Sequence, residues 1–220
     1  MKSMLVVAAH LDDIEIGMGG TFLKLIDEEI NPCVIVMCSG DVPNRKTDDH
    51  DSRITAFYNN MKNAGVDSNN IVTYSFPSNA LHMQDTNLLI SHVSSAIDAY
   101  QPEIVFTTNY GDINQDHRVM SGVTRVATRP RHDMCVNELY EFPIPGSTEW
   151  NHQECDINYI VDITKYHKQK LQQISQYKTE IRPDPDPCSL GKIEARDMYL
   201  GGIYGMKYAE GFRQVFRRCR

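Results

Sequence analysis

The stretch "MLVVAAHLDDIEIGMGG" (residues 4–20) decides the fold, because an apolar segment runs directly into charged residues and then into glycines. Residues 4–9 are apolar without interruption, which is typical of a parallel strand covered on both faces. His10, Asp12 and Asp13 follow where such a strand should end. Charged groups are costly to remove from water unless they are paired or bind a metal. The placement therefore predicts a functional site at the carboxyl end of the first strand.

The same alternation of apolar runs and helix-like segments continues along the chain. Further strands are predicted at residues 33–38, 71–76, 103–108 and 137–142. Amphipathic helices are predicted between them, in residues 19–29, 52–65, 86–101 and 116–130. This rhythm is typical of a Rossmann-like, doubly wound α/β fold with a mainly parallel sheet and right-handed crossovers.

The last third of the sequence is less regular, and we expect it to form an irregular C-terminal extension. It contains a predicted strand (158–164), a long polar helix (165–180), a proline-rich loop (182–189) and a further helix with a closing segment (190–212). The basic end "FRQVFRRCR" (212–220) is predicted to be a solvated tail. Because no repeat or low-complexity linker is present, residues 1–220 are expected to form one domain.

Composition narrows the range of functions. The formal net charge is -7 and the pI about 5.6, which argues against a general nucleic-acid or membrane-surface binder, since such proteins rely on Lys and Arg. No run approaches the roughly 18 apolar residues of a membrane span. The six cysteines show no CxxC spacing, so no structural zinc ribbon is indicated. We expect a cytoplasmic protein that acts on a small molecule.

A second polar loop, "NYGDINQDHR" (109–118), follows the fourth predicted strand. In open parallel sheets, ligands bind beyond the carboxyl ends of the strands, at the point where the strand order reverses. The usual doubly wound order places the first and fourth strands side by side at that point. The fold therefore predicts that this loop meets residues 10–13.

Together the two loops supply the ligands of a metal site. His10, Asp13 and His117 make two imidazoles and one carboxylate, and three protein ligands leave a position open for water, as in catalytic zinc sites. Zinc lowers the pKa of a bound water to about 7, and Asp12 could accept its proton as a general base. Two simpler interpretations remain: Asp13 could cap a helix, and His117 could be a surface histidine. An iron(II) oxygenase uses the same ligand types, but the α/β pattern disfavours it.

Three neighbouring features have two interpretations each. Asp112 and Asp116 could orient the metal ligands or cap the fourth helix. The glycines of "GMGG" (17–20) suggest a dinucleotide site and a nucleotide-dependent oxidoreductase, but they lack the G-x-G-x-x-G spacing. Gly19 and Gly20 are more simply explained by a tight entry into the first helix.

The two loops carry a resemblance to a known family. "AAHLDDIEIGMGGTFLKL" (8–25) resembles the signature of the PIG-L/LmbE family of zinc-dependent deacetylases, AHPDD[EI]xxGxGGT, and "GDINQDHR" (111–118) resembles its second motif. The resemblance implies one zinc ion per chain on His10, Asp13 and His117, with Asp12 as general base. It implies hydrolysis of an N-acetyl group on a glucosamine-like sugar or its conjugate, releasing acetate and a free amine. It also makes a homo-oligomer a reasonable expectation.

Two positions depart from the family pattern. Leu11 replaces a proline, and Asn114 stands where many members carry a histidine. An asparagine can donate a hydrogen bond to a developing oxyanion but cannot transfer a proton. Asn114 is therefore predicted to help polarise the carbonyl, while Asp12, or a substitute such as His132, would protonate the amine. The departure also leaves open a non-catalytic sugar or nucleotide-sugar binding module with the same fold.

Three further residues are candidates for substrate binding. Arg53 resembles a family arginine near the substrate pocket, although it could equally lie on a helix surface. "STEW" (147–150) and "YAEGF" (208–212) resemble segments of one branch of the family. Glu149 and Trp150 could line a sugar pocket, with the indole stacked on the ring, or Trp150 could be an ordinary core residue.

Overall fold

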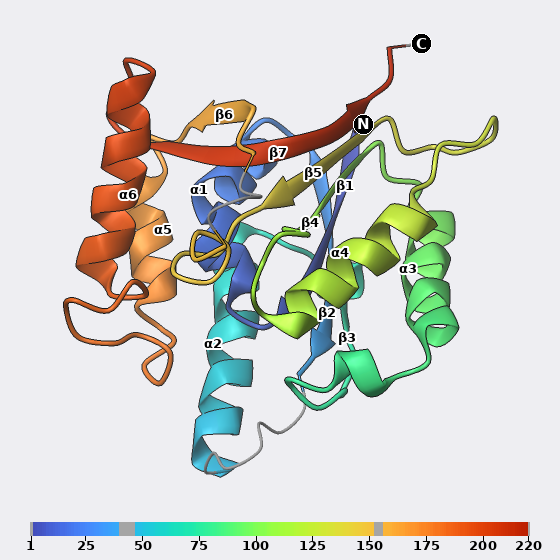
Figure 1. Ribbon diagram of the computed structural model, residues 1–220, viewed down its shortest axis with the longest axis horizontal. Helices are drawn as coiled ribbons and strands as arrows, with labels where there is room; N and C mark the ends of the chain where they lie inside the picture. The colour runs from blue at the N-terminus through green and yellow to red at the C-terminus, as the bar shows by residue number, and fades with distance from the viewer. Residues whose placement is uncertain (1, 40–46, 152–155, 220) are drawn as a thin grey trace.

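A seven-stranded sheet crosses the middle of the computed structural model, which describes residues 2–39, 47–151 and 156–219 (Figure 1). The strands follow the spatial order β3-β2-β1-β4-β5-β7-β6. Their bounds are β1 (Ser3–His10), β2 (Asn31–Cys38), β3 (Ile71–Thr73), β4 (Ile104–Thr108), β5 (Glu138–Phe142), β6 (Tyr159–Asp162) and β7 (Ala209–Arg217). The helices are α1 (Asp13–Asp27), α2 (Thr47–Ala64), α3 (Thr86–Tyr100), α4 (Gln115–Ala127), α5 (His167–Ile174) and α6 (Leu190–Ile203), with 3-10 turns η1 (Ser68–Asn70) and η2 (Leu81–Met83).

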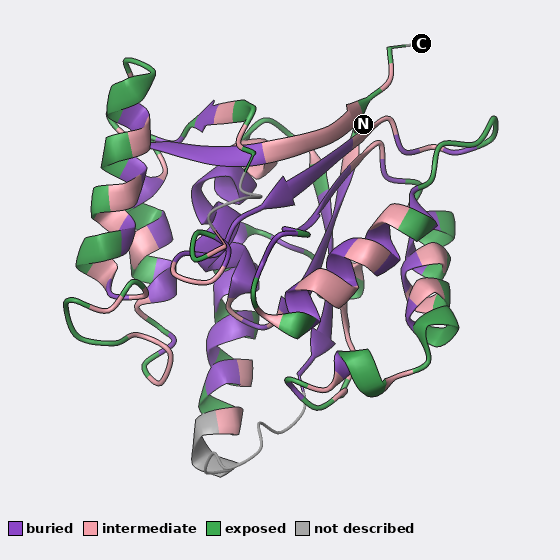
Figure 2. Ribbon diagram, viewed as in Figure 1, coloured by how far each residue is buried: buried purple, intermediate pink, exposed green. Residues whose placement is uncertain are grey.

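Strand β1 lies between β2 and β4 and pairs with both in parallel. Side chains alternate across a strand, so Met4 and Val6 face one layer of helices and Leu5 and Val7 face the other, all without exposed surface. The central strands are buried except at residues at their ends (Figure 2). Their continuous apolar sequence is thus explained by helices on both faces, and the predicted doubly wound sheet is confirmed.

Each face of the sheet is covered by its own set of helices. Helices α1, α2, α5 and α6 cover one face of the sheet, and α3 and α4 cover the other (Figure 1). The crossover through α1 runs from β1 to β2 on the first face, whereas the connection from β4 to β5 passes through α4 on the second. The loops that leave β1 and β4 therefore diverge, and the sheet opens at their carboxyl ends. The predicted switch point is confirmed by the neighbouring positions of β1 and β4.

The glycines after β1 have a different role from the one predicted. Helix α1 already begins at Asp13 but is kinked at Met18, whose φ of -146° and ψ of 19° are not helical. Gly19 and Gly20 therefore follow a kink inside α1 rather than open it. A Cβ atom on Gly17 would come within 2.4 Å of the Phe142 side chain, and one on Gly20 within 2.7 Å of Ile163. The glycines let α1 pack closely against the end of β5 and the residue that follows β6.

The C-terminal third departs from the sequence prediction at two places. The basic end, predicted to be a tail, forms most of β7, which lies between β5 and β6 and is antiparallel to both. Arg217 lies 3.5 Å from Glu138 of the neighbouring strand β5, while Phe212 is fully buried. The predicted helix 165–180 ends at Ile174. Tyr177 beyond it is buried and donates a 2.7 Å hydrogen bond to the Leu11 carbonyl, which holds the following turns against β1.

A buried ionic cluster joins this region to α1. The Lys170 ammonium lies 2.7 Å from Asp197 and 2.8 Å from Glu210, and all three side chains are almost fully buried. Burial favours the neutral amine, but the two carboxylates outweigh this effect and raise the pKa of Lys170. Glu210 also accepts the backbone N–H groups of Gly20 and Thr21 at 2.9 and 2.7 Å. The cluster therefore connects α5, α6, β7 and α1.

Lys170→Met is expected to destabilise the fold by about 3–5 kcal/mol, because it leaves two buried carboxylates without their cation. The measurement is urea-induced unfolding of the variant and the wild-type protein. Lys168→Met, on the exposed side of the same helix, is the matched control and should change the free energy of unfolding by less than about 0.5 kcal/mol. An equally small change for Lys170→Met would show that the cluster does not stabilise the fold.

Among the described helices, none combines the length and the apolar composition that crossing a bilayer requires.

Candidate active site

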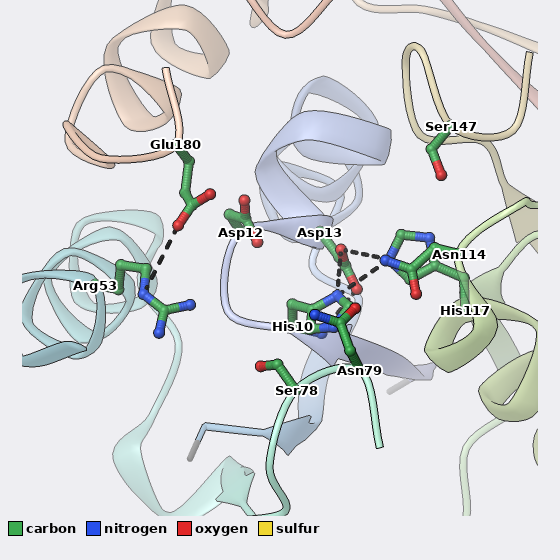
Figure 3. Close-up of a pocket in the computed structure, with 10 residues that line it drawn as sticks. All are labelled: His10, Asp12, Asp13, Arg53, Ser78, Asn79, Asn114, His117, Ser147 and Glu180. Atoms are coloured by element: carbon green, nitrogen blue, oxygen red, sulfur yellow. Dashed lines mark hydrogen bonds and ion pairs between the residues drawn. The ribbon is translucent and has the colours of Figure 1, made fainter. Parts of the chain in front are cut away.

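Two histidines and one carboxylate meet where β1 and α4 approach each other (Figure 3). His10 is the last residue of β1, Asp13 begins α1, and His117 lies in the first turn of α4. His10 Nδ1 is 3.1 Å from His117 Nε2 and 3.5 Å from Asp13 Oδ1, and His117 Nε2 is 3.2 Å from Asp13 Oδ1. Ligands of a tetrahedral zinc ion, bound at 2.0–2.1 Å, lie about 3.3 Å apart. The three atoms have the spacing of one face of such a site.

The second oxygen of Asp13 fixes the direction of the carboxylate. Asp13 Oδ2 accepts the backbone N–H groups of Ala9 and His10, at 3.0 and 2.8 Å. Oδ1 is thereby turned toward the two imidazoles. Asp13 thus joins the strand end to the helix start and still offers one oxygen to a cation.

Each histidine has a second carboxylate on the far side of its ring. His10 Nε2 lies 3.1 Å from Asp116 Oδ2, and His117 Nδ1 lies 3.0 Å from Asp112 Oδ2. Such contacts set the tautomer and orientation of a metal-binding histidine. They leave His10 Nδ1 and His117 Nε2 directed at the cavity.

Both outer carboxylates are held by further hydrogen bonds. Asp116 accepts the backbone N–H groups of Asn79 at 2.5 Å and Leu81 at 3.1 Å. Asp112 accepts the hydroxyl of Thr148 at 2.5 Å, the hydroxyl of Ser147, and the backbone N–H of Asn114 at 2.7 Å. The segments after β3 and β5 therefore support the imidazoles indirectly.

The electrostatics of the cluster favour a cation. Burial would lower the pKa of His10, but Asp13 and Asp116 outweigh burial and raise this pKa to about 10. The pKa of His117 is raised to about 9, because Asp13 and Asp112 likewise outweigh burial. Burial opposes the ionised form of Asp13, yet the two histidines hold its pKa far below its usual range. The carboxylates attract positive charge that a metal ion can supply in place of protons.

A second possible ligand set shares one residue with the first. His10, Cys38 and Asp116 also bring their donor atoms together. Burial, followed by the nearby carboxylate of Asp116, raises the pKa of the Cys38 thiol far above its usual range, whereas the thiolate is the form that binds metals. Asp116 is already occupied by two N–H groups and by His10. The donor set of His10, Asp13 and His117 therefore fits a metal better.

Asp12, the N-cap residue of α1, lines the same cavity between Asp13 and Glu180 (Figure 3). Burial raises the pKa of its carboxyl to about 6, with further contributions from the negative charges of Asp13 and Glu180. Asp12 is outside the group of donor atoms that could hold a metal. It is placed as a carboxylate that can exchange a proton near neutral pH.

Asn114 is the N-cap of α4 and also lines the cavity. Its Oδ1 accepts the backbone N–H of Asp116 at 2.9 Å. The cap occupies the oxygen, so the amide nitrogen is the group that remains available to the cavity. The sequence did not predict that Asn114 caps α4. The cap contact holds the side chain in place and so gives its amide nitrogen a fixed position as a hydrogen-bond donor.

The cavity has a volume of about 200 Å³ and contains residues that the sequence did not indicate. Arg53 enters it from α2 and lies 3.8 Å from Glu180, and its part in substrate binding stays a prediction. The unpredicted members are Ser78, Asn79, Ser147 and Glu180. No spacing pattern marks them, because they come from irregular segments after β3, β5 and α5.

Three predicted residues lie elsewhere in the structure. Glu149 and Trp150 are absent from the described residues that line the cavity; Glu149 pairs with Arg196, and Trp150 is 70% exposed. His132 lies beside Arg131 and Arg218 in a different hollow. The turn after β5 directs Ser147 and Thr148 toward Asp112 instead, and the role of Glu149 and Trp150 in sugar binding stays a prediction.

Comparison with protein families agrees with this geometry. The sequence model of the PIG-L family, described as GlcNAc-PI de-N-acetylase, matches residues 5–128, more than half of the chain. The chain belongs to the PIG-L family. The matched region contains the donor set, Asp12 and Asn114.

Several individual proteins are similar over nearly the whole chain. Diacetylchitobiose deacetylase of Thermococcus kodakarensis is 22% identical, over 98% of this chain and 84% of that protein. The structure of N,N'-diacetylchitobiose deacetylase from Pyrococcus horikoshii has a TM-score of 0.78 and 20% identity, over 97% of this chain and 84% of that chain. 4-Carboxy-2-hydroxymuconate hydratase from Pseudomonas putida has a TM-score of 0.72 and 18% identity, over 100% and 98%. The fold thus occurs with more than one reaction, and the reaction has to be argued from the site.

Proposed function

We propose that this PIG-L protein is a zinc-dependent hydrolase that removes the N-acetyl group from an amino sugar or an amino-sugar conjugate. One zinc ion per chain would be held by His10, Asp13 and His117. The observation that carries the proposal is this donor set with Asp12 beside it, in a chain similar to deacetylases of acetylated sugars. The products would be acetate and a free amine.

The metal, when bound, supplies a Lewis acid that polarises the acyl carbonyl and makes a water molecule more acidic. His10 and His117 would bind it through Nδ1 and Nε2, the nitrogens that face away from Asp116 and Asp112. Asp13 would bind it through Oδ1, since Oδ2 is taken by backbone N–H groups.

Asp12 is proposed to carry the proton that the reaction moves. It would accept a proton from the attacking water and return it to the amide nitrogen as the carbon–nitrogen bond breaks. A pKa of about 6 leaves most of the carboxyl ionised at neutral pH and still allows the protonated form to donate. One residue can thus serve both steps, which removes the need for a histidine at position 114.

Asn114 is proposed to stabilise the negative charge that develops on the acyl oxygen. Its amide nitrogen donates a hydrogen bond without titrating, and the N-cap contact to Asp116 holds the side chain in place. Donors fixed in advance are effective because they need no reorganisation during the reaction.

The proposed function is tested by measuring acetate release from a panel of N-acetylated sugars, nucleotide sugars and glycosides, with N,N'-diacetylchitobiose included. The zinc-loaded protein is expected to release acetate from at least one uncharged N-acetylglucosamine derivative. Tight binding of a panel member at full zinc loading, without acetate release, would instead identify a non-catalytic binding module. Cytoplasmic location and a homo-oligomeric state stay predictions.

A further inference from the structure

We propose that Glu180 and Ser78, together with Arg53, form a hydroxyl-recognition wall that selects an uncharged sugar with neighbouring free hydroxyls. The inference rests on the proposed function and deepens it, because it names the part of the substrate that the pocket recognises. Of these residues, only Arg53 was suggested by the sequence.

Arg53 and Glu180 form an ion pair inside the cavity. Arg53 Nε lies 3.8 Å from Glu180 Oε1, and the two side chains are only 6% and 16% exposed. At that distance the pair is not a hydrogen bond, and Arg53 Nε has no hydrogen-bond partner among the described residues. Figure 3 shows the pair on one side of Asp12, with Asn114 and Ser147 on the other.

Ser78 supplies a second observation that points to a ligand. Its residue is 3% exposed, and its Oγ has no hydrogen-bond partner within the described parts of the chain. Burying a hydroxyl without a partner is unfavourable. In Figure 3 the hydroxyl points to the side of the cavity where Arg53 lies. A ligand group that reaches this wall would satisfy it.

The chemistry of the wall matches neighbouring hydroxyls. A sugar hydroxyl both donates and accepts a hydrogen bond. Glu180 can accept from one, Arg53 can donate to one, and the Ser78 hydroxyl can do either. An apolar group would leave the Ser78 hydroxyl and Arg53 Nε without hydrogen-bond partners. The wall would therefore form hydrogen bonds with the hydroxyls of the sugar ring, while the donor set and Asn114 would face the acetamido group.

The charges in the cavity argue against an anionic substituent at this wall. Asp12, Asp13 and Glu180 contribute three carboxylates, against the guanidinium of Arg53 and the divalent cation that the donor set would bind. No positive charge is in excess among the described lining residues. A phosphate or carboxylate beside Glu180 would be repelled, so the expected substrate is neutral where it contacts the wall.

The inference is tested with Ser78→Ala and Glu180→Gln, using N-acetylglucosamine, its 3-, 4- and 6-deoxy derivatives and its 6-phosphate. Ser78→Ala is expected to raise KM about 10-fold with kcat nearly unchanged, as for an interaction made equally in the ground and transition states. Wild-type protein should use the 6-phosphate at least 10-fold less well than the parent sugar. Thr21→Val is the matched control, because Thr21 Oγ1 is another buried hydroxyl without a partner among described residues but lies outside the cavity.

For Glu180→Gln, the informative quantity is the preference for the parent sugar over its deoxy derivatives. The rate alone is not informative, because the charge of Glu180 also acts on Asp12. At least one deoxy derivative should be about 10- to 100-fold poorer than the parent sugar for the wild type, and this difference should largely disappear in Glu180→Gln. Isothermal titration calorimetry with the same sugars measures the preference as a difference in binding affinity, independently of turnover.

Four outcomes separate this inference from the proposed function. Acetate release with unchanged KM in Ser78→Ala and unchanged discrimination in Glu180→Gln would overturn the wall alone. Sugar binding that weakens in both variants, without acetate release in the wild type, would support the wall and overturn the deacetylase. Absence of both binding and release would overturn both. The expected shifts together with acetate release would support both.

Discussion

Replacing Asp13 or His117 by alanine is expected to remove the bound metal and to abolish acetate release. Each change deletes one of three donor atoms whose mutual distances match a tetrahedral site. Asp13→Ala also leaves the backbone N–H groups of Ala9 and His10 without their acceptor. The measurement is metal content after dialysis, by mass spectrometry, alongside acetate release. We expect at least a 100-fold loss of metal affinity, more than the roughly 10- to 100-fold typical of a supporting residue.

The matched controls are Asp27→Ala and His82→Ala, which replace the same residue types at exposed positions. Both should retain the metal content of the wild type. Wild-type metal stoichiometry in Asp13→Ala and His117→Ala would contradict the donor set and turn attention to the alternative set with Cys38.

Asp12→Asn is expected to keep the metal and to lose turnover by about 10²- to 10⁴-fold, the contribution of a positioned general base. Asparagine has nearly the same size as aspartate but cannot accept the proton. Because Asp12 supplies no donor atom to the set, metal content should not change. The measurement is kcat for acetate release at equal metal loading.

This separation of metal binding from turnover distinguishes Asp12 from Asp13, its neighbour in sequence. Loss of metal in Asp12→Asn would mean that Asp12 is a ligand rather than the base. Turnover similar to that of the wild type, at full loading, would reject the base role and require another proton acceptor in the cavity.

The site's framework could be predicted from the sequence because it depends on local patterns. The apolar run 4–9 ends at His10, and the run 103–108 precedes Asp112 and His117, so strand ends and polar loops can be read directly. The order of strands in a doubly wound sheet then brings the two loops together. Strand β1 lies beside β4, and the donor atoms lie within 3.5 Å of one another.

Other features depend on contacts between distant segments, which a local pattern does not contain. The charges of the basic end predict a solvated tail, yet most of β7 is formed by this segment and is stabilised by pairing with β5 and β6. The polar stretch 165–180 appeared to be one helix, but Tyr177 is held by Leu11, 166 residues away. Ser78 and Glu180 lie in irregular segments, so only the folded chain brings them to Arg53.

The most direct test of the central claim is a zinc titration of metal-free protein, with acetate release measured at each step. Acetate release is expected to rise with added zinc and to level off at one ion per chain, and Asp12→Asn is expected to stay inactive at the same loading. Full acetate release by metal-free protein, or a plateau reached only at two ions per chain, would contradict the central claim.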